Sequence, residues 1–176
     1  MKQGEPLVYY VDNGAPEPIR SALVDGVSYW KEAFQAAGQD FEVKVLPDDM
    51  SINDVSINVV EWVHRETRGF SYGTWLSNPF NGQILKGHIV LGSRRIRQDY
   101  LLAEGLLCPY GESSTFVGNG TDSKALGVDE SKDPMLKLAL HRARQLAAHE
   151  VGHSLGLKHN YAASNHDRAS VMVILE

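Results

Sequence analysis

The sequence has little of several features that would assign it to a class at once. Cys108 is the only cysteine among 176 residues, so no intrachain disulfide is possible and we expect a buried or half-buried thiol. No apolar run approaches the length of about 20 residues that a bilayer span requires. Residues 1–6 lack the apolar stretch of a secretion signal. The formal net charge of −5 argues against a nucleic-acid partner, because phosphate binding requires a basic surface.

What the sequence does contain is an ordinary globular composition. Hydrophobic residues make up 43% and charged residues 22%, a balance that supports a hydrophobic core. The chain length suits one domain. We therefore interpret residues 1–176 as a single domain.

Segments rich in β-branched and aromatic residues predict five strands, and helical patterns lie between and after them. The strands are expected at residues 7–11, 41–46, 57–63, 70–76 and 84–91. The segment 57–63 is the most apolar, so we expect it to be central in its sheet. The sequence Asn78–Gly82 has strong turn chemistry and predicts a turn between the last two strands. Strands alternating with helices indicate an α/β layer architecture.

Three helices are predicted. The first runs from Pro16 to about Ala37, the second from residue 94 to 107 with an interruption near Gly105, and the third begins at Asp133–Pro134. Residues 111–132, between the second and third helices, are rich in Gly, Ser, Asp and Asn and predict a long exposed loop. The third helix carries the part of the sequence with recognisable chemistry.

Two histidines and a glutamate are spaced for metal chemistry on this helix. His149 and His153 are four residues apart, so their imidazoles lie one above the other and can share an ion. Glu150 lies about a quarter-turn away, beside the ion. Gly156 can adopt the left-handed conformation that ends a helix, which allows the chain to turn and bring His159 to the same metal.

Three neutral imidazoles with an open coordination position are the ligand set of a catalytic zinc. A structural site would need a fourth protein ligand, and the remaining histidines leave that alternative open: His64, His88, His141 and His166. A bare His-Glu-x-x-His also occurs by chance on solvated helices. The added Gly156 and His159, each with a structural reason, favour one bound Zn²⁺ over that interpretation.

The pattern His149 to His159, followed by Ser170–Met172, resembles the signature and methionine turn of the metzincin clan of zinc peptidases. Further stretches are similar to a family of large bacterial zinc-dependent metalloproteases common in Bacteroidetes: Tyr9–Asn13, Lys44–Asp49, Trp62–Arg65, Arg97–Tyr100 and His159–Ser164.

The resemblance implies a metzincin-like fold of α/β (α+β) class. Its twisted, mostly parallel five-stranded sheet would have an antiparallel edge strand, a backing helix and a long active-site helix. The edge would lie within Gly69–Leu76, and its residues Ser71, Tyr72, Gly73, Thr74 and Trp75 would bind an extended peptide as an added strand. Met172 would form an apolar base beneath the imidazoles, and Asn160 could orient His159 by a hydrogen bond. The resemblance also implies an extracytoplasmic parent protein.

The sequence departs from the resemblance at its C-terminal end. We expect Asp-Tyr after the methionine, but Val173–Ile174 follows here. Only 17 residues follow His159, so the lobe that walls the specificity pocket is expected to be mostly absent.

The predicted function is zinc-dependent endopeptidase activity, with Glu150 as the base for a metal-activated water. Two alternatives stay open: a zinc-containing peptide-binding module without turnover, and a zinc hydrolase acting on a non-peptide amide or ester. The sequence does not indicate an oligomeric state.

Overall fold

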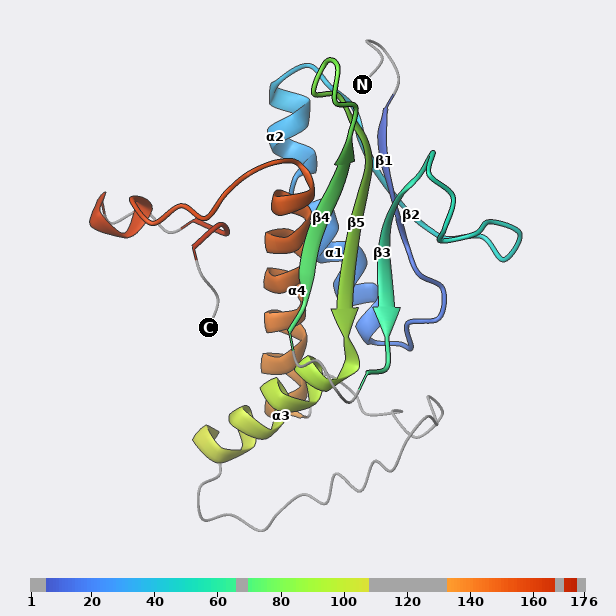
Figure 1. Ribbon diagram of the computed structural model, residues 1–176. Coiled ribbons are helices and arrows are strands. Elements are labelled where there is room, and N and C mark those ends of the chain that lie inside the picture. The colour runs from blue at the N-terminus through green and yellow to red at the C-terminus, as the bar shows by residue number, and fades with distance from the viewer. Residues whose placement is uncertain (1–5, 66–69, 108–132, 167–169, 174–176) are drawn as a thin grey trace.

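The computed structural model describes residues 6–65, 70–107, 133–166 and 170–173 (Figure 1). Within these ranges the strands are β1 (Leu7–Val11), β2 (Phe41–Val45), β3 (Asn58–Val63), β4 (Tyr72–Ser77) and β5 (Ile84–Gly92). The helices are α1 (Ile19–Ser28), α2 (Lys31–Ala36), α3 (Ser93–Leu107), α4 (Pro134–Ser154) and the short 3₁₀ helix η1 (Ala163–His166).

The five strands form one sheet in the order β2-β1-β3-β5-β4. Neighbours pair in parallel except β4, which pairs antiparallel with β5 at the edge. The predicted five strands, the central place of β3 and the antiparallel edge are all confirmed. The β4–β5 turn has a left-handed glycine, Gly82 at φ +70°, as its Asn-Gly sequence predicts.

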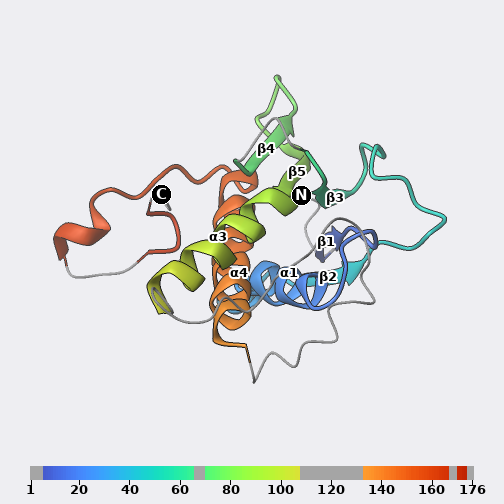
Figure 2. The same ribbon diagram turned by 90° about the horizontal axis from the view of Figure 1, so that it is seen from below.

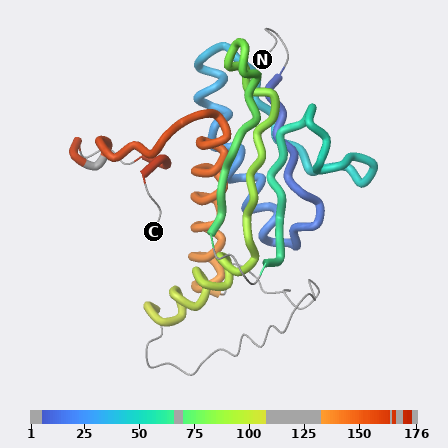
Figure 3. Tube along the Cα trace, viewed as in Figure 1, coloured from blue at the N-terminus to red at the C-terminus, as the bar shows by residue number. Residues whose placement is uncertain are grey.

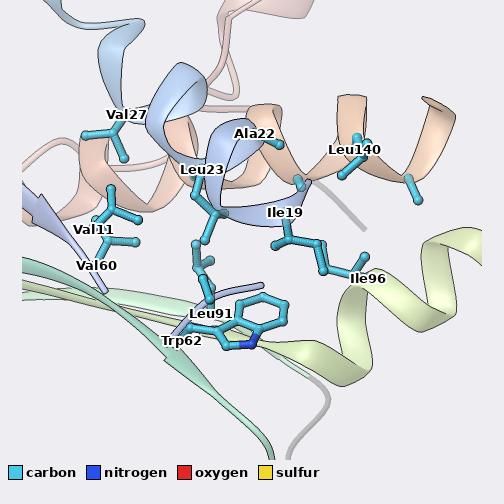
Figure 4. Packing of buried hydrophobic residues seen from close by; sticks show 14 of the residues in the cluster. Val11, Ile19, Ala22, Leu23, Val27, Val60, Trp62, Leu91, Ile96 and Leu140 are labelled. Atoms are coloured by element: carbon cyan, nitrogen blue, oxygen red, sulfur yellow. The ribbon is translucent and has the colours of Figure 1, made fainter. Parts of the chain in front are cut away.

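Helices α1 and α4 lie side by side on one face of the sheet (Figure 2). The core lies between these layers, where inward residues of β1, β3 and β5 meet the apolar stripes of the helices (Figure 4). Helix α4 has an apolar stripe at helical spacing that is fully buried, with relative exposures of 0–6%: Leu136, Leu140, Ala143 and Ala147. Alternation in the strands and helical spacing in α1 and α4 therefore both serve one core.

The first predicted helix is broken into α1 and α2 at Tyr29–Trp30, so the expectation of one continuous helix to Ala37 is wrong. Ser28 Oγ donates to the carbonyl oxygen of Val24 at 2.7 Å, a back-bond that competes with the helical ladder. The break leaves the indole Nε1 of Trp30 donating to the carbonyl oxygen of Ala148 at 2.9 Å. A contact with α4 thus accompanies the end of α1.

Helix α3 is continuous through Gly105, so the predicted interruption is also wrong. A glycine inside a helix costs about 1 kcal/mol relative to alanine. The helix remains anchored to the rest of the fold by its buried face, which includes Ile96, Tyr100 and Ala103. That packing outweighs the local preference of one glycine.

Helix α4 begins as predicted at an Asp-Pro pair. The carboxylate Oδ1 of Asp133 accepts hydrogen bonds from the backbone N–H groups of Met135 and Leu136 at 2.9 and 3.0 Å, which satisfies two otherwise unpaired donors. After α4 ends, the chain runs away from the sheet before folding back (Figure 3). Cys108, Gly69 and the predicted loop 111–132 lie outside the described residues. No helix in the described ranges combines the length and apolar character that a membrane span demands.

Candidate metal centre

The last two turns of α4 carry His149, Glu150 and His153. The helix ends at Ser154, and Gly156 follows with φ +88°, a left-handed conformation that side chains with a Cβ adopt at a cost. The backbone N–H groups of Gly156 and Leu157 donate to the carbonyls of His153 and Gly152 at 2.8 and 3.0 Å, a pattern typical of a glycine-terminated helix. This turn returns the chain toward the helix face that bears the two histidines.

The turn brings His159 to the other two imidazoles. Ring centroids lie 4.6 Å apart for His149 and His153, 4.8 Å for His153 and His159, and 5.2 Å for His149 and His159. One ring nitrogen from each residue lies within 4.8 Å of the others, and the Nε2 atoms of His153 and His159 are 3.2 Å apart. The structure thus brings together the three residues that the sequence spacing predicted.

Backbone carbonyl groups hold two of these rings. The Nδ1 atom of His149 lies 2.7 Å from the carbonyl oxygen of Val171, and that of His153 lies 2.9 Å from the carbonyl oxygen of Leu157. Because a carbonyl oxygen can only accept, each Nδ1 carries the proton and each Nε2 keeps its lone pair. Burial lowers the pKa of His149, although the Val171 carbonyl opposes this shift. Burial thus favours the neutral form that binds metals.

Glu150 is buried beside this cluster, with a relative exposure of 6%. Burial raises the pKa of its carboxyl group, while the electrostatic interaction with His153 and a hydrogen bond from the backbone N–H of Gly73 act to lower it. A carboxyl group with a raised pKa is better suited to take up and return a proton near neutral pH than an ordinary one.

Gly73 also joins β4 to α4 by direct backbone contact. A Cβ atom at this position would lie 2.1 Å from the carbonyl oxygen of Glu150, so only glycine fits without a backbone shift. The other predicted edge residues differ in their exposure to solvent. Thr74 and Trp75, after Gly73, are exposed, whereas Ser71 and Tyr72, before it, are half-buried. Strand β4 therefore packs against α4 at Gly73, next to the buried carboxylate of Glu150.

Met172 packs beneath the same helix. Its Sδ atom lies 2.2 Å from the position that a Cβ of Gly152 would occupy, and Trp30 borders the same space. Met172 has a relative exposure of 5%. Asn160 lies next to this residue through its backbone, since its N–H donates to the Met172 carbonyl at 2.8 Å. The turn containing Met172 is thus attached both to α4 and to the segment after His159.

The other histidines do not join the candidate group in the described part of the chain, where the only such cluster is His149, His153 and His159. His88 Nε2 pairs with Glu61 Oε2 at 2.8 Å between neighbouring strands. The ring of His64 meets Trp62 edge-on with a centroid separation of 5.9 Å. The alternative of a fourth histidine ligand gains no support.

The donor set fits a zinc ion. Zinc in catalytic sites takes three protein ligands, prefers tetrahedral geometry and binds imidazole nitrogen at about 2.0–2.1 Å. Such bonds place the ligand atoms about 3.3 Å apart, which is close to the 3.2 Å separation of the His153 and His159 Nε2 atoms.

Comparison with known protein families agrees with this geometry. Residues 131–172 match a family described as Met-zincin. The matched segment includes all of α4, the three histidines and Met172. Comparisons with curated proteins and with solved structures found no match. The Met-zincin match and the histidine cluster together indicate a metalloprotease-like protein with a zinc site.

Some contacts around the site were not apparent from the sequence. The sequence gave Trp30 and Tyr161 no functional role, yet Trp30 donates a hydrogen bond to the helix that carries the histidines, and Tyr161 contacts His159. A hydrogen bond between Tyr9 and Ser154 across the core, at 2.9 Å, was also missed. Trp30 and Ala148, like Tyr9 and Ser154, lie far apart in the chain, so their spacing carries no signal of the contact.

Proposed function

We propose that this chain is the catalytic domain of a zinc-dependent endopeptidase. The observation that carries the proposal is the convergence of three imidazoles beside a buried glutamate that hydrogen-bonds the sheet's edge strand. A general base, three metal ligands and an edge strand that can bind an extended peptide thus lie at one place in the fold. The proposal includes the bacterial family suggested by the sequence resemblance and, with it, an extracytoplasmic parent protein.

In this proposal His149, His153 and His159 hold one zinc ion through their Nε2 atoms. Zinc, when bound, acidifies a water molecule and polarises the scissile carbonyl group. The backbone carbonyls of Val171 and Leu157 keep two rings in the required tautomer. Met172 supports the site from below through its contact with Gly152.

Glu150 is the proposed general base and then the general acid. Its carboxylate accepts a proton from the attacking water and delivers that proton to the leaving amine. Two features support this role: burial that raises its pKa and a fixed position from the Gly73 N–H. A base held this way needs little rearrangement before proton transfer.

The proposed substrate is a protein or peptide in extended conformation. Strand β4 is the last strand of the sheet, so its outer edge offers backbone groups to an added strand. Residues Ser71–Trp75 provide that edge, and the Gly73–Glu150 contact sets its distance from the base. A substrate strand bound here would pass beside the metal ligands rather than across the far side of the sheet.

The test is cleavage of a denatured protein by the zinc-loaded chain, with and without a chelator. We expect cleavage that stops on chelation and returns with added zinc. Glu150→Gln keeps the shape of the side chain and should keep zinc affinity while lowering kcat by about 10²–10⁴-fold. Glu42→Gln, on β2 at the opposite edge of the sheet, is the matched control and should retain activity.

Retained peptidase activity in Glu150→Gln contradicts the role given to Glu150. Zinc binding without cleavage of any protein substrate supports the binding-module alternative instead. Chelator-sensitive hydrolysis of small amides or esters, with peptides left intact, supports the non-peptide hydrolase.

A further inference from the structure

A second hydrogen bond orients each histidine that holds a metal, because the ring nitrogen facing away from the ion must also be satisfied. For His149 and His153 the partner is a backbone carbonyl, at 2.7 and 2.9 Å. These partners belong to the main chain, so side-chain substitutions leave them in place. The third ligand is held differently.

The Nδ1 atom of His159 lies 3.5 Å from the hydroxyl oxygen of Tyr161. The two rings also meet edge-on, with centroids 5.8 Å apart and an interplanar angle of 78°. Tyr161 thus contacts this ligand both through its hydroxyl and through its ring. The contact lies at the surface, since Tyr161 is 67% exposed.

The direction of this hydrogen bond follows from the metal site. The Nε2 atom of His159 faces Nε2 of His153 at 3.2 Å, so a neutral His159 that offers Nε2 to a metal carries its proton on Nδ1. Nδ1–H then donates and the Tyr161 hydroxyl oxygen accepts. This contact would fix the tautomer and the ring plane together.

We propose that Tyr161 is a positioning residue for the third metal ligand, and that its hydroxyl sets the metal affinity of the site. The proposal rests on the metal site of the proposed function but not on peptide cleavage. His159 lies beyond the end of α4, where the helical ladder no longer fixes its backbone. The ligand outside the helix is therefore the one whose orientation depends on a side chain.

The experiment measures zinc affinity of the full chain by competition with a chromogenic chelator. Tyr161→Phe removes the hydroxyl and keeps the ring, and we expect zinc affinity to fall about tenfold, the scale typical of a lost supporting hydrogen bond. Tyr161→Ala removes the ring contact as well and should bind at least as weakly. Tyr29→Phe is the control, because Tyr29 is similarly exposed at 59% and its ring contacts Trp30.

Two further measurements separate positioning from general structure. The absorption spectrum of the cobalt-substituted chain should change in Tyr161→Phe and stay unchanged in Tyr29→Phe. The unfolding midpoint of the metal-free chain should be the same in both, since each substitution removes an exposed hydroxyl. Wild-type zinc affinity together with a wild-type cobalt spectrum in Tyr161→Phe overturns the role of Tyr161 alone. Failure of the wild-type chain to bind zinc overturns the metal site itself, and with it both proposals.

Discussion

The Sδ atom of Met172 occupies the space that a side chain at Gly152 would need, 2.2 Å from the position of its Cβ. Gly152 lies on α4 between the ligands His149 and His153. Trp30 closes the same space at 2.9 Å from that position. The absence of a side chain at residue 152 therefore allows the turn beneath the site to approach the helix.

Gly152→Ala should destabilise the protein, although alanine is the better helix former. The added methyl group overlaps Met172 and Trp30, and overpacking of this kind costs about 1–3 kcal/mol. Urea unfolding of the metal-free chain measures the change. Gly105→Ala in α3 is the control: its Cβ would meet nothing within 4 Å, so it should stabilise by about 0.5–1 kcal/mol.

Met172→Ala tests whether the sulfur is the obstacle. If it is, the combination Gly152→Ala/Met172→Ala should be less destabilised than the sum of the single variants, with a coupling energy of about 0.5 kcal/mol or more. Strict additivity would show that the two residues do not share this space.

Gly73→Ala should separate the edge strand from the helix. Its Cβ would lie 2.1 Å from the backbone oxygen of Glu150, and neither backbone can move away as a flexible side chain would. We expect a loss of at least about 1–3 kcal/mol in the free energy of unfolding and a lower kcat. Gly92→Ala, in β5 with nothing within 4 Å of its Cβ, is the control. Equal behaviour of the two variants would contradict the close packing.

A buried hydroxyl pair ties the sheet to the end of α4. Tyr9 hydrogen-bonds Ser154 Oγ at 2.9 Å, and Ser154 Oγ donates to the Val151 carbonyl at 2.7 Å. Ser154→Ala leaves the Tyr9 hydroxyl buried without this partner and should cost about 1–3 kcal/mol. Tyr9→Phe leaves Ser154 bonded to Val151, so it should cost less. Denaturant unfolding of both variants measures the two losses of stability. A larger loss for Tyr9→Phe than for Ser154→Ala would contradict the assignment of the Tyr9 hydroxyl as donor to Ser154 Oγ.

Because Tyr9 is buried, we expect the free energy of unfolding to fall at alkaline pH. Burial raises the pKa of Tyr9 from 10.0 to about 12, so between these values the unfolded chain releases a proton that the folded chain retains. The folded state binds more protons there, and the free energy of unfolding falls as pH rises, by up to about 1.4 kcal/mol per pH unit. Tyr9→Phe should show a shallower slope from pH 10 to 12. An unchanged slope would show that Tyr9 does not titrate in this way.

Local sequence patterns predicted much of this fold because they record which face of each element is buried. The apolar character of β3 predicted its central place in the sheet, and residues of β3 and α4 meet in one core. The Asp133–Pro134 start of α4 and the left-handed Gly156 after it were also predicted. Each of these features depends on a few neighbouring residues, so it could be predicted from a single sequence.

Apart from the contact between Tyr161 and His159, the features that sequence reasoning missed depend on contacts between distant segments. The break between α1 and α2 accompanies a bond from Trp30 to Ala148, 118 residues away. The requirement for glycine at position 73 comes from the backbone of Glu150. Gly105 predicted an interruption that α3 does not have, because the packing of this helix outweighs the low helical preference of glycine. Tertiary contacts decided each of these cases.

The central claim is that His159 completes a zinc site with the two histidines of α4. The most direct test is zinc content and affinity of the purified chain, compared with His159→Ala and with His141→Ala, an exposed histidine on the same helix. The account predicts about one zinc per chain for wild type and His141→Ala. It predicts for His159→Ala a loss of affinity beyond the roughly 10–100-fold cost of a missing supporting hydrogen bond. Wild-type zinc stoichiometry and affinity in His159→Ala would contradict it.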